Sequence, residues 1–207
     1  MRRQKIFLTC LFLLIVGCIL LRFSKFSGRQ EEAHQINAAC EAYRDEVSSE
    51  AAQYDMSKYV DLILAVMMQE SSGQGTDPMQ SSEGAYNTRY PQQPNGITDP
   101  SYSISCGIQE LKYALDKAGC TGPTDLSKIR LALQAYNFGA DSYFAYLEEN
   151  GQTVWTAQSA QAFAQMASGG TQRDEDDPLH DPAGPWDYGD QYYPDHVLRY
   201  YHLDNNS

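Results

Sequence analysis

The sequence predicts a mainly α-helical fold that is preceded by a single N-terminal transmembrane or signal-anchor helix. Residues 6–21 are uncharged and almost wholly apolar, with basic residues on both sides, as is typical of a membrane anchor. Further along, apolar residues recur at helical spacing, and no convincing strand with alternating polarity appears outside 71–105. The predicted parts are an anchor or signal segment over 1–26, a polar helical stalk over 27–54 and one compact domain over 55–207.

The apolar segment 6–21 is slightly shorter than the roughly 20 residues that span a bilayer, but Phe23 extends it and Arg22 can reach the interface. As an uncleaved single-pass anchor it would hold the domain at the extracytoplasmic face of the cell membrane. A cleaved signal peptide would give a secreted protein, although no A-x-A-like site follows. A lipoprotein signal ending at Cys18 would give a lipid-anchored one, although the next residues are apolar.

Charge is distributed unequally along the chain. Residues 1–30 hold six Lys/Arg and no Asp/Glu, which leaves nine basic and 27 acidic residues over 31–207, a formal charge of −18. Such an acidic body argues against nucleic acid as a partner, because nothing would neutralise the phosphates. We therefore expect recognition by shape and hydrogen bonds.

The domain contains three cysteines, Cys40, Cys106 and Cys120. In an exported protein Cys106 could pair with Cys120, which would leave Cys40 over. No CxxC or CxH spacing predicts zinc, and the acidic run 173–181 lacks the spacing of a calcium-binding EF-hand loop. No metal and no cofactor is expected.

The compact domain is predicted as a series of helices. Segment 57–70 is apolar almost all round, with Ser57 at the N-cap position and Ser-Ser-Gly after it, which predicts a buried helix. Residues 71–105 carry turn signals. Further helices are predicted over 107–119, over 125–150 with a bend near Gly139, over 156–168 and, after an acidic Pro/Gly loop, over 192–203.

Glu70 lies in the last turn of the buried helix 57–70. The negative end of the helix dipole disfavours another negative charge there, and burial disfavours it further. Both effects predict a raised pKa, which a general acid working near neutral pH requires. The alternative is a solvated glutamate at a helix end.

Four short strings occur in order along the chain: QES at the end of the buried helix, then SISCGIQ, LALQAYNFG and YYPDHVLRYY. Together they resemble the lysozyme-like fold of soluble lytic transglycosylases and goose-type lysozymes. The longer strings MMQESSGQGTDPMQSSEG and YGDQYYPDHVLRYY more closely resemble the CwlT-like lysozyme domain of membrane-anchored wall hydrolases of Gram-positive bacteria, often carried on conjugative elements. The resemblance covers roughly 55–203 and implies peptidoglycan glycan strands as the substrate.

The resemblance also implies residue roles. Glu70 would protonate the glycosidic oxygen, and Asp77 would assist the attack of water on the opposite sugar face. Glu83 and Asp99 are alternatives to Asp77 on the same loop, and a turn residue before Pro78 is the structural interpretation of Asp77. The residues implied for substrate binding are Ser71, Gly107, Ile108, Gln109, Tyr136, Asn137 and Tyr193. Core positions are the alternative for Ile108 and Tyr136.

Three functions compete. An N-acetylmuramidase would cleave the MurNAc–GlcNAc β-1,4 bond and open the wall locally, for example for a secretion or conjugation channel. A lytic transglycosylase would form 1,6-anhydro-muramic ends and needs no second carboxylate, so the presence of Asp77 favours hydrolysis. An inactive glycan-binding or channel-scaffold module is the third.

Two departures from the family pattern give further expectations. Some relatives carry a cysteine endopeptidase domain after the lysozyme domain, and because the sequence ends at Ser207 no peptide cleavage is expected. Pro194 stands where relatives carry a β-branched residue, so the last helix is expected to start differently.

Overall fold

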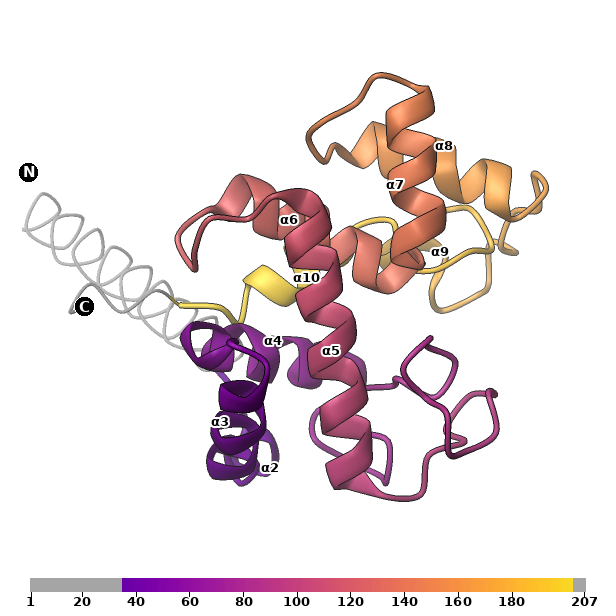
Figure 1. The fold of residues 1–207 in the computed structure, drawn as a ribbon. Coiled ribbons are helices and arrows are strands. Elements are labelled where there is room, and N and C mark those ends of the chain that lie inside the picture. The colour runs from indigo at the N-terminus through magenta and orange to yellow at the C-terminus, as the bar shows by residue number, and fades with distance from the viewer. Residues whose placement is uncertain (1–34, 203–207) are drawn as a thin grey trace, which may run out of the picture. The chain divides into compact units, whose positions relative to one another are not determined.

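The computed structural model describes residues 35–202 (Figure 1). The anchor predicted over 1–26 lies outside the described residues, and within them no helix is long and apolar enough to cross a membrane. The helices are α2 (Ala38–Glu41), α3 (Arg44–Gln53), the 3-10 helix η1 (Ser57–Tyr59), α4 (Val60–Ser71), α5 (Pro100–Ala118), α6 (Leu126–Phe138), α7 (Ala140–Glu149), α8 (Ala157–Ala167), α9 (His180–Ala183) and α10 (Tyr193–Leu198).

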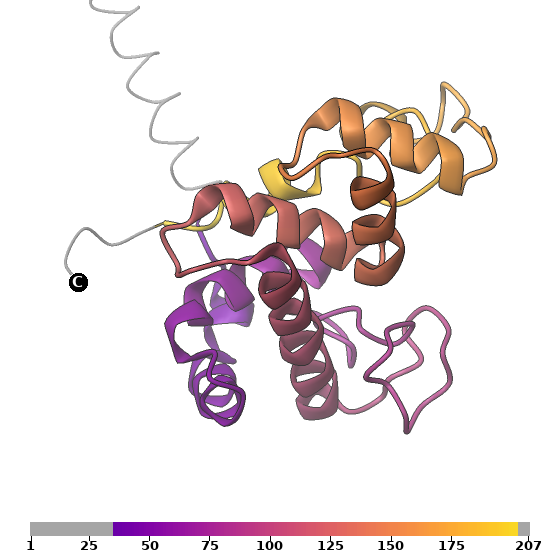
Figure 2. The same ribbon diagram turned by 45° about the horizontal axis from the view of Figure 1, so that its top comes forward.

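The described part of the chain is helical, as predicted. Its β-type pairing is one isolated antiparallel bridge between Gln172 and Trp186. Helix α4 is the centre of the core, because six consecutive residues, Leu62 to Met67, are fully buried. Helices α3 and α10 pack on α4, and the long helix α5 packs on α6 (Figures 1 and 2). The apolar run that predicted a buried helix therefore marks the middle of the domain.

The stalk predicted over 27–54 is wrong from residue 36 onward, where the chain belongs to the compact unit. Val47 and Ala51 on α3 and Cys40 on α2 are fully buried in the core. The side chain of Asn37 donates a hydrogen bond to the backbone oxygen of Ser72 at 3.0 Å, which ties this segment to the end of α4. Small alanine side chains allow close helix packing without the large apolar residues that usually signal burial.

Three helix boundaries differ from the prediction. Helix α5 starts at Pro100, seven residues before the predicted 107, because Asp99 caps it by accepting the backbone N–H groups of Ser101 and Tyr102; the turn signal was a helix start. Ser57 begins a 3-10 helix and makes no cap. The predicted bend near Gly139 is a break between α6 and α7, with Gly139 at φ +85°.

The last helix, α10, is shorter than predicted and carries Pro194 in its first turn. A proline is tolerated there because the first backbone N–H groups of a helix have no partner within it. The side chain of Pro194 is buried. The family departure at this position is therefore accommodated without loss of the helix.

The suggested Cys106–Cys120 disulfide is absent, and both cysteines are free. Cys106 lies within α5 and its thiol approaches the backbone oxygen of Tyr86, whereas Cys120 lies just beyond the end of this helix. The helical part between them, from residue 106 to 118, alone spans about 18 Å at 1.5 Å per residue. A disulfide cannot bridge that distance.

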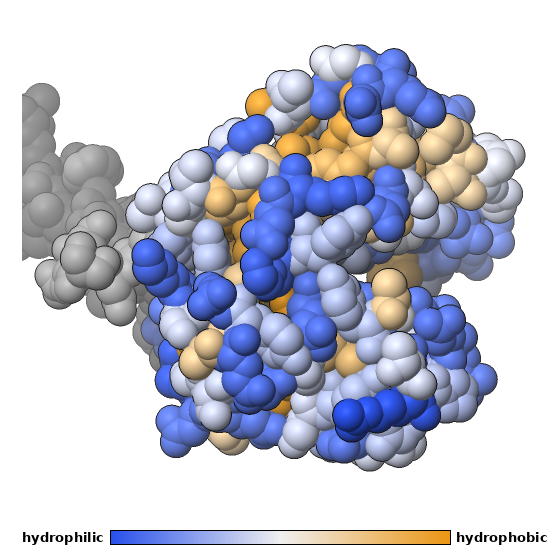
Figure 3. All heavy atoms as spheres, in the orientation of Figure 1, coloured by the Kyte–Doolittle hydropathy of each residue, from blue (hydrophilic) through white to orange (hydrophobic). Residues whose placement is uncertain are grey.

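Figure 3 shows a mainly hydrophilic face with an apolar area near α7. A cavity of about 460 Å³ lies between α5, α6 and α7, and Leu131, Phe144 and Leu147 are among the residues that line it. Glu70 is not among the lining residues of this cavity. Glu70 lies instead at the end of α4.

Candidate active site

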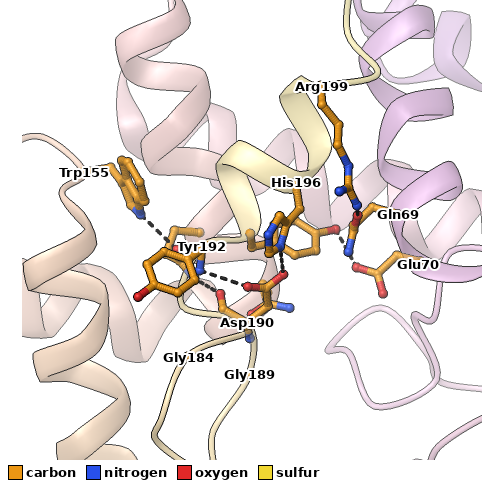
Figure 4. Close-up of polar contacts among 12 residues, drawn as sticks. Gln69, Glu70, Trp155, Gly184, Gly189, Asp190, Tyr192, His196 and Arg199 are labelled. Atoms are coloured by element: carbon orange, nitrogen blue, oxygen red, sulfur yellow. Dashed lines mark hydrogen bonds and ion pairs between the residues drawn. The ribbon is translucent and has the colours of Figure 1, made fainter. Parts of the chain in front are cut away.

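Glu70 stands at the C-terminal end of α4, which stops because Ser72 adopts a left-handed conformation with φ +55°. Its side chain is half-buried. The hydroxyl of Tyr193 on α10 donates a hydrogen bond of 2.5 Å to Oε1 of Glu70. Glu70 is labelled in Figure 4, where a dashed line ends at its carboxyl group. The carboxyl group is thus held by a residue 123 positions further along the chain.

Burial raises the pKa of Glu70 from its usual 4.5 to about 7. The hydrogen bond from Tyr193 acts in the opposite direction, and the negative charges of Asp190, Asp77 and Glu110 raise this pKa further. The raised pKa predicted from the sequence is confirmed. A carboxyl group with such a pKa retains its proton near neutral pH and can donate it to a leaving group.

Two tyrosines connect Glu70 to the neighbouring elements. The rings of Tyr136 on α6 and Tyr193 stack, with centroids 6.3 Å apart and an angle of 22° between their planes. The hydroxyl of Tyr136 donates to the backbone oxygen of Met79 at 2.9 Å. Burial raises the pKa of both tyrosines well above the usual value, so both remain protonated hydrogen-bond donors.

Asn137 follows Tyr136 on α6 and contacts the segment that leads into α10. Its amide oxygen accepts the backbone N–H of Asp190 at 2.8 Å. Gly189 permits this approach, because a Cβ atom there would lie 2.7 Å from the same oxygen and from the ring of Phe138. Only the amide oxygen of Asn137 is used in this contact, and the amide N–H groups are left to other partners.

Asp77 is placed differently from Glu70, because its side chain is buried and its carboxylate accepts four hydrogen bonds. The residue is 1% exposed. One oxygen accepts from the hydroxyl of Ser103 on α5 at 2.6 Å and from the backbone N–H of Ser81 at 3.1 Å. The other accepts from the backbone N–H of Ser82 at 3.2 Å and from the Ser82 hydroxyl. These contacts bind the loop after α4 to α5.

The two alternatives to Asp77 also have clear positions. Glu83 is exposed, and Asp99 caps the N-terminus of α5.

Three of the residues implied for substrate binding, Ser71, Gly107 and Ile108, make packing contacts or hydrogen bonds within the protein. Ser71 donates through its hydroxyl to the backbone oxygen of Pro78 at 2.8 Å, which folds the loop back on α4. Gly107 lets the loop approach α5, because a Cβ atom there would lie 2.6 Å from Cβ of Met79. Ile108 is fully buried in the core, the alternative given for it above.

Gln109 lies with a different group of residues. Its amide nitrogen donates to the backbone oxygen of Ser105 on the same helix at 3.1 Å. It lines a cavity of about 630 Å³ together with Tyr54, Tyr86 and Arg89. The structure therefore brings Glu70, Tyr136, Asn137 and Tyr193 together and places Gln109 in a neighbouring cavity.

Glu110 is a carboxyl group near the site to which the sequence analysis gave no role. Burial raises its pKa to about 7, and it accepts the backbone N–H of Ala85. A Cβ atom at Gly84 would overlap its carboxylate, so the loop lies directly on it. Its position three residues after Gly107, on the same side of a helix, was the signal that could have located it.

Asp190 and His196 were also given no role, although both occur in the string YGDQYYPDHVLRYY that carried the resemblance. Nδ1 of His196 and Oδ2 of Asp190 are 2.5 Å apart. Figure 4 shows this pair between the start of α10 and Glu70. A carboxylate two residues before a Tyr-Tyr-Pro helix start was the available signal.

The chain is similar to several known proteins. The chain is 35% identical over 173 residues, 84% of its length and 43% of the relative, to the bifunctional muramidase/DL-endopeptidase CwlT of Bacillus subtilis. It is 40% identical over 111 residues, 54% of its length and 45% of the relative, to the membrane protein YocA of the same species. The chain thus spans less than half the length of these two relatives.

A solved structure of a protein described as similar to a lipoprotein of the NLP/P60 family, from Staphylococcus aureus, aligns with a TM-score of 0.68 at 27% identity, covering 84% of this chain and 56% of that one. The family model described as lysozyme-like matches residues 38–201, which include both the end of α4 with Glu70 and the start of α10 with Tyr193. The chain therefore belongs to the lysozyme-like family.

Proposed function

We propose that this protein is a peptidoglycan hydrolase, an N-acetylmuramidase that cleaves the MurNAc–GlcNAc β-1,4 glycosidic bond with Glu70 as its general acid. One observation carries the proposal: a carboxyl group whose pKa is raised to about 7 is held at a helix end by a tyrosine hydroxyl. Similarity to CwlT, whose name includes a muramidase activity, supports the same reaction.

In the proposed mechanism Glu70 gives its proton to the glycosidic oxygen as the bond to the leaving sugar breaks. Glu70 then becomes a carboxylate, and the hydrogen bond from Tyr193 stabilises that charge. The amide N–H groups of Asn137 and the face of Tyr136 bind the sugar next to the acid. General acid catalysis of this kind contributes about 10² to 10⁴ in rate.

Asp77 is the proposed second carboxylate, which assists the attack of water. Its negative charge, held by four hydrogen bonds, supports an electrostatic role opposite the positive charge that develops on the sugar ring. To take a proton from water, it must first release one of these donors. The Ser103 and Ser82 hydroxyls are the mobile ones, because a hydroxyl can rotate away and a backbone N–H cannot.

A lytic transglycosylase is the second candidate, and the geometry of Asp77 is the observation that favours it. A carboxylate with both oxygens occupied is a poor base, and a reaction in which the muramic acid hydroxyl attacks needs no second base. In that case Asp77 serves only to fold the loop after α4. A module that binds glycan without cleaving it is the third candidate.

The same proposal covers location and partners. The apolar segment 6–21 would anchor the protein in the cell membrane, with the domain on the extracytoplasmic side facing peptidoglycan strands. The relative YocA is described as a membrane protein, which supports this placement. A tethered wall hydrolase could open the wall locally for a secretion or conjugation channel.

The test is the mass of the products that the full chain releases from purified peptidoglycan. The matched variants are Glu70→Gln and Glu83→Gln, the latter removing an exposed glutamate of the adjacent loop. Reducing muramic ends that disappear only in Glu70→Gln would support the muramidase. Ends lighter by one water would identify a transglycosylase, and binding without release by the unmodified chain would leave the glycan-binding module.

A further inference from the structure

The segment before α10 is fixed to α6 through the backbone of one residue, Asp190. Its N–H donates to the amide oxygen of Asn137 at 2.8 Å, and its carbonyl oxygen accepts from the side chain of Gln134 at 2.8 Å. Gln134 is fully buried and is held in turn by Trp155, whose ring nitrogen donates to it at 2.9 Å. Asp190 therefore starts α10 from a fixed position on α6.

The side chain of Asp190 then sets the first turn of α10. One carboxylate oxygen accepts the backbone N–H of Tyr192 at 2.9 Å, and the other is 2.5 Å from Nδ1 of His196 (Figure 4). The two side chains are only 15% and 22% exposed. The backbone N–H of Tyr193 also bonds to the Asp190 carbonyl oxygen, at 3.2 Å.

Tyr193 lies between the two contact points of Asp190 on α10, and its hydroxyl is the donor to Glu70. A second contact draws the same elements together, because Arg199 at the end of α10 donates to the side chain of Gln69 on α4 at 2.9 Å. The orientation of Tyr193 toward Glu70 thus depends on where α10 begins, and Asp190 determines that point.

We propose that Asp190 is a positioning residue for the reaction proposed above: together with His196 it fixes the first turn of α10, so that Tyr193 is held on Glu70, and it brings a negative charge to the edge of the site. The inference rests on the proposed function for its catalytic meaning. Its geometric part, the path from α6 through Asp190 and α10 to Glu70, rests on the contacts alone.

Charged and titratable groups reach Glu70 from each neighbouring element. Besides Asp190 they are Asp77 from the loop, Glu110 from α5, Tyr136 from α6 and Tyr193 from α10. His196 contacts Asp190, and Arg199 contacts Gln69. Among the effects that raise the pKa of Glu70, burial is the largest and the negative charge of Asp190 is the second largest. Removing its charge therefore lowers this pKa. Removing His196 instead loosens the first turn of α10 and weakens the Tyr193 hydrogen bond, and because that bond lowers the pKa of Glu70, its loss raises this pKa.

The experiment uses the full chain and three variants: Asp190→Asn, His196→Ala and the control Asp195→Asn. Asp195 lies on α10, five residues after Asp190, and its ion pair is with Arg130. The control therefore removes the same charge at a position that is not among those that raise the pKa of Glu70. Two quantities are measured against pH: the rate of peptidoglycan cleavage, and the NMR signal of the ¹³C-labelled carboxyl of Glu70, assigned by its loss in Glu70→Gln.

We expect the alkaline limb of the rate profile and the Glu70 titration to move to lower pH in Asp190→Asn, by about half a pH unit or more. Both move to higher pH in His196→Ala and stay in place in Asp195→Asn. The cleavage rate at its optimum falls about tenfold in His196→Ala, because Tyr193 is less well fixed, whereas asparagine in Asp190→Asn retains an oxygen that can accept the Tyr192 N–H. A purely structural role could lower the rate but could not shift the two titrations in opposite directions.

The two hypotheses fail separately. If the unmodified chain cleaves no wall polymer, the proposed function is wrong, and the NMR titration still tests the position of Asp190. If the Glu70 titration is the same in all folded variants, the inference about Asp190 is overturned, whatever the activity. If Asp190→Asn does not fold, the His196→Ala shift to higher pH decides the question by itself.

Discussion

Glu70 and Asp77 are seven residues apart, but their carboxyl groups differ in burial and in the number of hydrogen bonds that they accept. Glu70 is half-buried and accepts a hydrogen bond from the Tyr193 hydroxyl, and burial raises its pKa to about 7. Asp77 is 1% exposed and accepts four hydrogen bonds from three serines. A buried carboxylate with many hydrogen-bond donors stabilises the segments that supply them. A buried carboxyl group with few donors has a raised pKa and keeps its proton to higher pH.

The largest expected effect is on catalysis. Glu70→Gln keeps the shape of the side chain and can still accept the Tyr193 hydrogen bond, but it has no proton to transfer. We expect the rate of peptidoglycan cleavage to fall about 10³-fold or more, with a melting temperature at pH 7.5 equal to or above that of the unmodified chain. Retention of a tenth of the activity would exclude Glu70 as the acid.

Whereas Glu70→Gln should keep its stability, Asp77→Asn should lose much of it. The amide nitrogen of asparagine would face hydrogen-bond donors in place of an acceptor, and one or two buried donors would lose their partner. We expect the free energy of unfolding to fall by about 3 kcal/mol in urea titration, against less than about 0.5 kcal/mol for the exposed Glu83→Gln. Unchanged stability would show that the four hydrogen bonds of Asp77 do not hold this loop in place.

The loop that Asp77 anchors can be tested at Gly107, where it meets α5. An alanine Cβ atom would lie 2.6 Å from Cβ of Met79, so the loop must move away. We expect Gly107→Ala to cost about 2 kcal/mol of unfolding free energy. The matched control is Gly122→Ala, where a Cβ atom meets nothing within 4 Å. Equal melting temperatures for the two variants would show that the loop is not packed as described.

The sequence predicted those parts of the fold that depend on apolar pattern and on special backbone positions. The apolar run 62–67 predicted a helix buried on all sides, and Gly139 predicted the interruption between α6 and α7. The sequence did not predict that α2 and α3 pack on the core, because their buried residues are small and few. It also missed the start of α5, because an Asp-Pro pair is a turn signal and a helix start at once.

Candidate site residues could be named from the sequence where a side chain matches a family string, but the partners that decide the role of each residue could not. The pKa of Glu70 depends on burial beneath elements that lie far along the chain, and the direction of its shift was predicted from the helix end together with the apolar residues before it. The four donors of Asp77 and the Asp190–His196 contact depend on tertiary structure. A sequence pattern can identify Asp77 or Asp190 as a candidate, but it does not show whether the side chain faces the substrate or stabilises a loop.

The smallest expected effect concerns the pH dependence of stability, and it extends the comparison to Glu110. Glu70 and Glu110 both have a folded-state pKa of about 7, above the usual 4.5. Their protonated forms favour folding, so this stability is fully present below pH 4.5 and is lost as pH rises to 7. The carboxyl groups with a lowered pKa, such as Glu41, act below this window.

We therefore expect the melting temperature to fall between pH 4.5 and 7, and to fall less steeply in the double variant Glu70→Gln/Glu110→Gln. General repulsion among the many acidic residues gives the same sign, so the difference between the two slopes is the measured quantity. Equal slopes for the unmodified chain and the double variant would mean that neither glutamate holds its proton at neutral pH, and Glu70 would then lack the property that a general acid requires.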